Sequence, residues 1–268
     1  MRRPSLDARR LASLAPALDV EVLEEATSTN AVAADRARAG AAEGHVVVAE
    51  QQTAGRGRLD RTWHTPPRAA LLFSVVLRPT VAAADWPWLP LLTGLSVSRA
   101  LQGLGYDAGV KWPNDVLVAG ADGESRKLVG ILVERVETPD GPAAVVGVGI
   151  NVSLTAAELP VPTATSLAIE SGTEPDRTAV LATVLSTLVE AYDAWQAGGA
   201  ESHRRLAASY AAACVTVGRD VRVEMPSGKP LLGRATGVDR GGRLLVDGPD
   251  GQTAVGAGDV VHVRAVDR

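Results

Sequence analysis

Residues 46–77, VVVAEQQTAGRGRLDRTWHTPPRAALLFSVVL, place a polar segment marked by glycine between two apolar runs. The runs Val46–Ala49 and Ala70–Leu77 predict two strands of one central sheet. The second run hardly alternates, as expected of a strand buried on both faces. Between them, Gly55 and Gly57 allow tight turns among Arg56, Arg58 and Arg61. Backbone N–H groups and guanidinium groups in such a loop bind phosphate or carboxylate. The stretch therefore predicts an anion-binding loop attached to a buried sheet.

The rest of the first 213 residues alternates between apolar runs of strand length and amphipathic runs of helix length. Helices are expected at Ser5–Leu14, Ala31–Ala39, Trp86–Leu104, the stretch capped by Asp176 and ended by Gly198, and Ser202–Ala213. Strands are expected at Val20–Glu24, Val110–Val118, Leu128–Glu134 and Ala143–Val152. A meander of the last three strands would bring Asp115, Lys127 and Asn151 to one rim. The pattern predicts an α+β fold, in which helices flank a central mixed or antiparallel sheet.

Beyond Cys214 the chain becomes a series of short alternating segments separated by Gly, Asp and Pro. They lie at Val221–Glu224, Leu231–Val238, Arg243–Val246 and Val260–Val263. This pattern predicts a small antiparallel β-barrel, and hence two domains, residues 1–213 and residues 214–268. From Thr216 onward, eight Arg and Lys residues stand against seven Asp and Glu residues, a balance that argues against a nucleic-acid face.

Composition narrows the class of protein. A length of 268 residues with 46% apolar residues supports a large core, and a formal net charge of −4 argues against a general nucleic-acid binder. The apolar runs are too short to span a membrane, Cys214 has no partner for an internal disulfide, and no charged-then-apolar leader is seen. These features predict a soluble protein of the reducing cytoplasm. The four histidines lack metal-ligand spacing, so no fixed metal site is expected.

Lysine is rare in this chain. Only three of the 27 Lys and Arg residues are lysines, and two of them, Lys111 and Lys127, stand in polar stretches beside apolar runs. A compact ammonium group on a flexible stem differs from a planar guanidinium group. Their retention indicates positions at which arginine does not serve.

Four short motifs follow the Ser-Thr-Asn at 28–30. They are Gly-Arg-Gly-Arg at 55–58, Lys-Trp-Pro-Asn-Asp at 111–115, Lys-Leu-Val-Gly-Ile-Leu-Val-Glu at 127–134 and Gly-Val-Gly-Ile-Asn at 147–151. In this order they resemble the biotin–protein ligases. The resemblance implies a catalytic domain of the class II synthetase type, followed by an SH3-like barrel. It also implies that biotin is activated by ATP as biotinyl-5′-AMP and is then transferred to a lysine of a biotin carboxyl carrier domain.

The resemblance assigns the site residues motif by motif. The predicted biotin-binding residues are Ser28, Thr29, Asn30, Gln52, Arg56, Gly57, Arg58, Lys127 and Gly130. The predicted ATP-binding residues are Gly55, Arg58, Trp63, Lys111, Asn114 and Asn151, and the predicted catalytic residues are Lys127, Arg58 and Asp115. Joining negatively charged groups requires fixed positive charge, which the loop and Lys127 would supply electrostatically. Several alternatives stay open. Ser28 and Thr29 serve helix capping alone or also binding, and Trp63 is a lid over the adenylate or part of the core. Lys111 offsets phosphate charge or forms a structural ion pair, and Asn114 and Asp115 face the substrates or form a plain turn.

Two departures from relatives limit the resemblance. Position 53 is Thr where a second glutamine is frequent, so only Gln52 is carried over as a ligand. About 20 residues precede the catalytic region, too few for a winged helix, which indicates a monofunctional ligase without an N-terminal DNA-binding domain.

The resemblance also implies the partners. The expected substrates are biotin and ATP, with Mg²⁺ accompanying ATP, and the expected partner is a transiently bound biotin carboxyl carrier domain. We expect a monomer or weak homodimer that binds neither nucleic acid nor membrane. Two other functions stay open, a lipoate–protein ligase with the same fold and a non-catalytic biotin sensor or regulator.

Overall fold

The computed structural model describes residues 3–120, 122–225 and 228–262. Within these ranges the first 213 residues build one seven-stranded sheet. Its strands are β1 (Asp19–Leu23), β2 (His45–Ala49), β3 (Ala70–Leu77), β4 (Ala108–Lys111), β5 (Asp115–Ala119), β6 (Ser125–Val136) and β7 (Ala143–Asn151). Their order in the sheet is β1-β2-β3-β7-β6-β5-β4. β1 pairs with β2 in parallel and the other neighbours pair antiparallel, so the predicted mixed sheet is confirmed.

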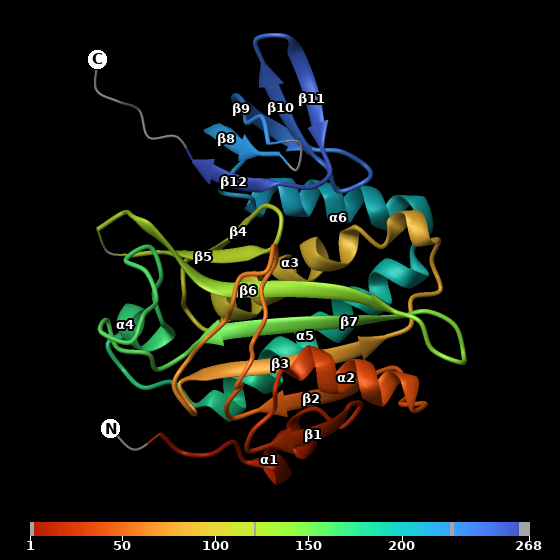
Figure 1. Cartoon of the computed structure of the whole chain (residues 1–268), viewed down its shortest axis with the longest axis vertical. Helices are drawn as coiled ribbons and strands as arrows, with labels where there is room; N and C mark the ends of the chain where they lie inside the picture. The colour runs from red at the N-terminus through yellow and green to blue at the C-terminus, as the bar shows by residue number, and fades with distance from the viewer. Residues whose placement is uncertain (1–2, 121, 226–227, 263–268) are drawn as a thin grey trace.

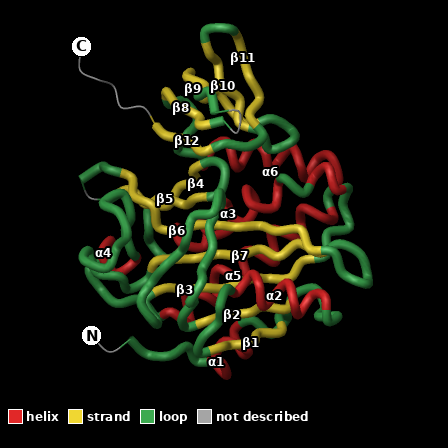
Figure 2. Tube along the Cα trace, in the orientation of Figure 1, coloured by secondary structure: helices red, strands yellow, loops and turns green. Residues whose placement is uncertain are grey.

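Helices cover both faces of this sheet (Figures 1 and 2). They are α1 (Ala8–Leu14), α2 (Thr29–Arg38), α3 (Trp88–Gly103), α4 (Leu167–Ser171), α5 (Arg177–Ala197) and α6 (Gly199–Ala213), with a short 3₁₀ turn η1 (Ala83–Asp85). α2 lies on the front face in Figure 1, while α3 and α5 pack behind the sheet and against each other. Among the described helices, none combines the length and the apolar character needed to cross a membrane.

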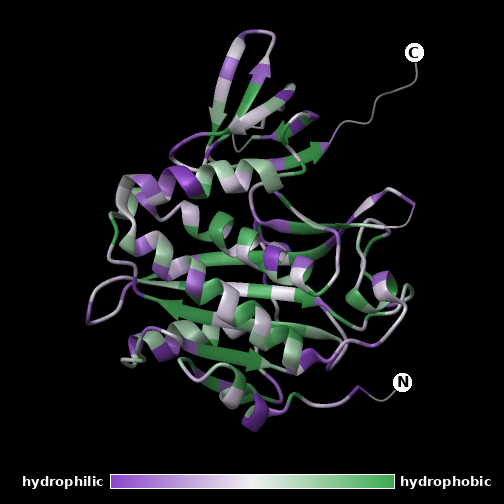
Figure 3. Ribbon diagram, turned by 180° about the vertical axis from the view of Figure 1, so that it is seen from behind, coloured by the Kyte–Doolittle hydropathy of each residue, from purple (hydrophilic) through white to green (hydrophobic). Residues whose placement is uncertain are grey.

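The central strands are buried on both faces, but successive side chains point to opposite sides. In β3, Leu71, Phe73 and Val75 belong to the main core behind the sheet. Figure 3, the view from behind, shows the hydrophobic strands beneath the helices that cover this face. The alternate residues Leu72 and Ser74 face forward, where the sheet is only partly covered by α2. The front face therefore has room for a site.

One predicted strand is wrong. Val110–Val118 is not a single strand but a hairpin, because β4 ends at Lys111 and β5 begins at Asp115. Pro113 lacks a backbone N–H and holds its φ near −65°, which suits a turn better than the middle of a sheet. The turn 112–114 places Asp115 directly opposite Lys111.

The described C-terminal residues form a five-stranded sheet, whose predicted antiparallel character is confirmed. Its strands are β8 (Asp220–Glu224), β9 (Leu231–Val238), β10 (Leu244–Gly248), β11 (Gly251–Val255) and β12 (Asp259–His262). β11 was not predicted, because four of its five residues are exposed and its apolar residues do not alternate. The predicted strand end at Val263 lies outside the described residues.

The second sheet rests against the first part of the chain. The indole N–H groups of Trp88 and Trp112 donate to the carbonyl oxygens of Arg240 and Gly242, at 2.8 and 3.0 Å. Buried residues of both sheets belong to one apolar cluster. These contacts hold the second sheet beside the edge of the first sheet that carries β4 and β5 (Figure 1).

Candidate active site

The glycine–arginine loop, residues 53–63, crosses the front of the sheet from β2 toward the second sheet (Figure 1). It is a small hairpin, with a bridge between Arg56 and Thr62 and a 2.6 Å bond from the Gly57 N–H to the Arg61 carbonyl. At its tip, Leu59 and Asp60 have φ values of 54° and 57°. Residues other than glycine rarely adopt this left-handed backbone conformation. The tip is therefore a strained turn that presents its arginines above the sheet.

Three glycines form the floor beneath the loop. Gly130 of β6 pairs directly with Gly149 of β7, and Gly147 lies two residues away on the same face. A Cβ on Gly130 or Gly149 would lie 2.7 Å from the indole of Trp63, and a Cβ on Gly147 would lie 2.0 Å from Asn30 Oδ1. The glycines thus let two side chains lie directly on the sheet. Trp63 Nε1 is buried and has no hydrogen-bond partner among the described residues.

A buried polar cluster forms one end of the site. Gln52 Oε1 accepts from the Thr29 backbone N–H at 2.7 Å and lies 3.1 Å from the Thr29 hydroxyl. Ser74 Oγ lies 2.8 Å from Thr29 Oγ1 and 2.6 Å from Asn30 Oδ1. Because Asn30 Oδ1 can only accept, the Ser74 proton is best used in that bond. The first turn of α2, the residue that precedes the loop and the sheet are therefore tied together by side chains.

The Ser28 and Thr29 hydroxyls make no capping hydrogen bond at the start of α2. Ser28 occupies the N-cap position of α2, but its side chain makes no capping hydrogen bond. The Thr29 hydroxyl bonds within the cluster instead. Capping alone therefore does not explain this Ser-Thr pair, and Ser28 and Thr29 both line the cavity.

Charged groups gather at the other end. Lys127 Nζ lies 2.6 Å from Asp115 Oδ1 and 5.7 Å from the centre of the Trp63 ring. Arg58 Nη1 donates to Asn114 Oδ1 at 3.1 Å. Of the four basic side chains that line the cavity, Arg58, Arg61 and Lys127 lie at this end, whereas Arg56 reaches toward Glu134 and Asn30. Such an end suits a polyanion.

The second sheet contributes to this charged end. Arg61 forms an ion pair with Asp259, the first residue of β12, and Arg58 Nη2 approaches the Gly258 carbonyl at 3.5 Å. Burial alone would raise the pKa of Asp259, but Arg61 and neighbouring cations hold that pKa below its ordinary value. Burial lowers the pKa of the Arg58 guanidinium. Arg58 and Arg61 of the loop are thus held against the β11–β12 turn.

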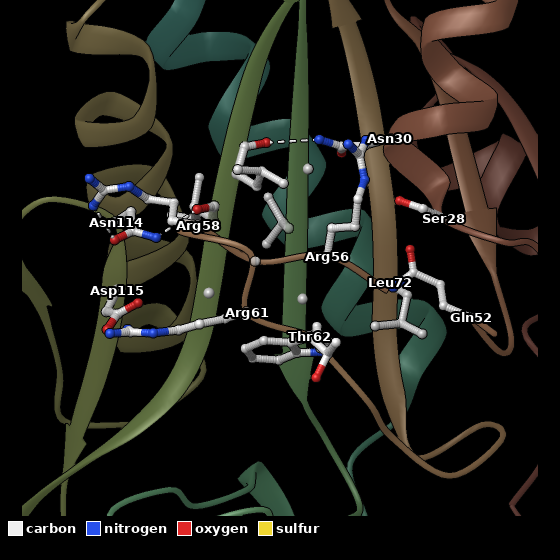
Figure 4. A pocket seen from close by; sticks show the side chains of 18 of the residues that line it. Ser28, Asn30, Gln52, Arg56, Arg58, Arg61, Thr62, Leu72, Asn114 and Asp115 are labelled. Atoms are coloured by element: carbon white, nitrogen blue, oxygen red, sulfur yellow. Dashed lines mark hydrogen bonds between the residues drawn. The ribbon is translucent and has the colours of Figure 1, made fainter. Parts of the chain in front are cut away.

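Most of the predicted site residues meet around one cavity of about 120 Å³ (Figure 4). Its lining includes Ser28, Thr29, Asn30, Gln52, Arg56, Gly57, Arg58, Trp63, Asn114, Asp115, Lys127 and Gly130. Figure 4 shows Ser28, Asn30 and Gln52 at one end and Arg58, Asn114 and Asp115 at the other. A second cavity, of about 1020 Å³, lies beside the first and shares residues 56–59 of the loop as a wall.

Three predicted site residues do not line the smaller cavity. Asn151 is buried and donates through Nδ2 to the Thr165 carbonyl at 3.0 Å. Gly55 lies at the base of the hairpin, where a Cβ would be 2.2 Å from the Trp63 carbonyl oxygen, and it lines the larger cavity instead. Lys111 lies on β4, close enough to lower the pKa of Asp259.

Several residues of the site were not predicted as site residues. Among them are Arg61, Ser74, Glu134, Gly147, Gly149 and Asp259. Glycines at alternate positions of an apolar strand indicate close approach from one face, a signal present in Gly147-Val-Gly149. Ser74 stands at a forward position of an otherwise apolar strand. Asp259 has no local signal, because folding brings it to Arg61 from 198 residues away.

Two parts of the chain match known protein families. Residues 22–151 match the biotin/lipoate A/B protein ligase family, and residues 216–263 match the biotin protein ligase C-terminal domain. The biotin--[acetyl-CoA-carboxylase] ligase of Mycobacterium tuberculosis is 39% identical over 251 residues, which span 91% of this chain and 89% of that protein. The bifunctional ligase/repressor BirA of Bacillus subtilis is 32% identical over 87% of this chain and 71% of its own length.

A solved structure agrees. The biotin protein ligase from Aquifex aeolicus, in complex with biotin and ATP, aligns with a TM-score of 0.77 at 29% identity over 92% of this chain and 99% of that one. Both the sheet that carries the site and the smaller C-terminal sheet thus have counterparts in known proteins. The chain belongs to the biotin/lipoate A/B protein ligase family and is a biotin protein ligase.

Proposed function

We propose that the two ends of the cavity bind biotin and ATP respectively, so that the protein makes biotinyl-5′-AMP and passes biotin to a carboxylase carrier domain. The observation that carries this assignment is the polarity of the lining, with amide and hydroxyl groups at one end and the three cations Arg58, Arg61 and Lys127 at the other. The hydroxyls and amides suit a ureido ring, which both donates and accepts. The cations suit phosphates.

In the first half-reaction, a biotin carboxylate oxygen bonds to the α-phosphorus of ATP, the bond to the β-phosphate oxygen breaks, and pyrophosphate leaves. Arg58 and Lys127 stabilise the charge that develops, because they are fixed in place beforehand by Asn114 and Asp115. In the second half-reaction a carrier lysine amine bonds to the acyl carbon, AMP leaves, and the amine loses a proton. We assign Asp115, the carboxylate beside Lys127, to bind the incoming amine.

The cavity must open for its substrates. About 120 Å³ is less than the roughly 300–1,000 Å³ typical of ligand pockets, and the Trp63 indole covers part of the floor. The shared loop wall separates this space from the larger cavity. We propose that the loop and Trp63 shift together when the ligands bind, after which Trp63 covers the adenylate.

Mg²⁺ enters this scheme with ATP. The carboxylates that line the cavity are Asp115 and Asp259, and each already faces a cation. Across the described ranges, no three His, Cys, Asp or Glu side chains are grouped so as to hold a metal ion. We propose that phosphate oxygens and water supply most of the Mg²⁺ ligands, as is common for this ion.

We also propose that residues 1–213 form the catalytic domain and residues 214–268 a domain that completes its charged end. The match of residues 216–263 to a separate family model supports this division. The ion pair of Arg61 with Asp259 supports the second part of the proposal. A cytoplasmic location and a monomeric or weakly dimeric state stay predictions from the sequence.

The test is incubation of the protein with ATP, Mg²⁺, biotin and a biotin carrier domain, followed by mass measurement of the carrier. We expect one added biotinyl group and release of pyrophosphate. Lipoate, added in competition, should leave the rate unchanged. Preferential use of lipoate would indicate a lipoate ligase, and absence of pyrophosphate release would indicate a sensor that binds biotin without catalysis.

A further inference from the structure

Glu134 joins two parts of the site through one carboxylate oxygen. It lies on β6, and its Oε2 accepts from Asn30 Nδ2 at 2.7 Å and from Arg56 Nη2 at 2.8 Å. Figure 4 shows the Arg56 side chain reaching back from the loop toward Asn30. The first turn of α2 and the glycine–arginine loop therefore meet at this atom.

The same oxygen determines which way the Asn30 amide faces. Nδ2 donates both to Glu134 and, at 3.2 Å, to the Leu132 carbonyl, so both of its hydrogens are used. Oδ1 accepts from Ser74 at 2.6 Å. A reversed amide would direct its oxygen at two acceptors. Asn30 is only 4% exposed, so water cannot readily replace a lost partner.

We propose that Glu134 is a positioning residue for biotin: it fastens Arg56 to Asn30 and so holds the glycine–arginine loop against the polar end of the cavity. The proposal rests on the assignment of this cavity to biotin. Glu134 lines the larger cavity and not the smaller one, so it acts through its two partners. Its charge matters, because hydrogen bonds to an ionised partner are roughly twice as strong as neutral ones.

A plain surface ion pair is the competing explanation. The Arg56 and Glu134 side chains are 48% and 32% exposed, and pairs of that kind contribute little to stability. What distinguishes this pair is the buried Asn30 amide, which depends on the same oxygen. If Glu134 only formed a plain ion pair, its loss would change neither the affinity for biotin nor the effect of a substitution at Arg56.

The variant Glu134→Gln preserves the size of the side chain and removes its charge. We expect the KM for biotin to rise about tenfold, as befits one weakened charged hydrogen bond. The turnover number should stay within about twofold of the parent, because the lost interaction serves binding and not the transition state. The matched control is Glu137→Gln, which removes an exposed pair with Arg135 just beyond the end of β6 and should change neither quantity.

A double-mutant cycle with Arg56→Gln tests the route of the effect. If Glu134 acts through Arg56, adding Glu134→Gln to Arg56→Gln should raise the KM for biotin by much less than tenfold. Arg56 is half exposed, so its variant tests the same contact without risk to the fold. An unchanged KM in Glu134→Gln, or fully additive effects, would overturn the proposal.

Calorimetric titration of the parent with biotin separates the two levels of the argument. If the parent binds biotin and Glu134→Gln has the parental KM for biotin, only the proposed role of Glu134 is refuted. If the parent bound no biotin, the assignment of the cavity would fall, and the role of Glu134 with it.

Discussion

Replacement of Lys127 by alanine tests the electrostatic core of the mechanism. Lys127 Nζ lies 2.6 Å from Asp115 Oδ1, and its side chain is 35% exposed, so the ammonium is held at the edge of the cavity and open to a ligand. Its 5.7 Å approach to the Trp63 ring adds a cation–π contact. Alanine removes the charge from a position that is already fixed before the reaction starts.

The expected loss follows from this geometry. Removal of one preorganised donor costs on the order of 10²–10³ in rate, or about 2.7–4 kcal/mol of transition-state stabilisation. The effect on folding should be much smaller, because a partly exposed ion pair contributes about 1 kcal/mol or less. Lys127→Ala should therefore fold normally and lose most of its adenylation activity.

The assay is biotin-dependent release of pyrophosphate, measured beside thermal unfolding. Lys127→Met should lose as much rate as Lys127→Ala, because it retains the apolar stem near Trp63 without the ammonium. Lys229→Ala, at an exposed lysine between β8 and β9, serves as the surface control and should match the parent. Near-parental rates in Lys127→Ala, or in Lys127→Met alone, would refute the electrostatic role.

Three further predictions concern other parts of the molecule. Arg58→Gly should still make biotinyl-adenylate but release it early, because roughly 1.5–3 kcal/mol of charged hydrogen bonding is lost; avidin blotting should then detect labelled serum albumin, and unchanged carrier selectivity at a normal adenylation rate would contradict this. Gly149→Ala should push Trp63 off the floor and raise the KM for ATP on the order of tenfold, as overpacking of about 1–3 kcal/mol implies. The control Gly103→Ala, where a Cβ meets nothing within 4 Å, should leave the KM for ATP unchanged. Burial, with nearby cations, lowers the pKa of His262 from 6.5 to about 4, so the unfolded chain binds more protons between these values. Stability should therefore fall as the pH drops from 6.5 toward 4, and His262→Gln should flatten the fall of the melting temperature; an equal fall in both proteins would count against it.

Much of the fold was accessible from local pattern. β3 was predicted with its observed ends, and the Asp176 cap of α5 is present, with its side chain accepting from the Ala179 N–H. The failures have local causes. The hairpin with its turn at Trp112-Pro113-Asn114 was predicted as one continuous strand because its flanks are apolar. β11 was not predicted because its apolar residues do not alternate. Turn chemistry, and not hydrophobicity, decides such segments.

The site was accessible only in part. The motifs indicated the residue types, and twelve of the predicted positions line one cavity. Their distribution between the two ends could not be read from the motifs. Asn151 shows the limit, since its amide carries the right chemistry but turns away to the Thr165 carbonyl. A motif states which groups are present, whereas hydrogen-bond partners decide where each group points.

By itself, the sequence determined the class of fold, the family resemblance and the existence of a glycine–arginine loop beside a buried sheet. These follow from properties of neighbouring residues, namely period, turn residues and motif spacing. Only the tertiary structure decided that Gly130 and Gly149 lie side by side under Trp63, that Glu134 holds Asn30 and Arg56 with one oxygen, and that Asp259 reaches Arg61. These contacts depend on strand register and on the packing of the second sheet against the first. Both are set by long-range burial and pairing, which no local pattern encodes.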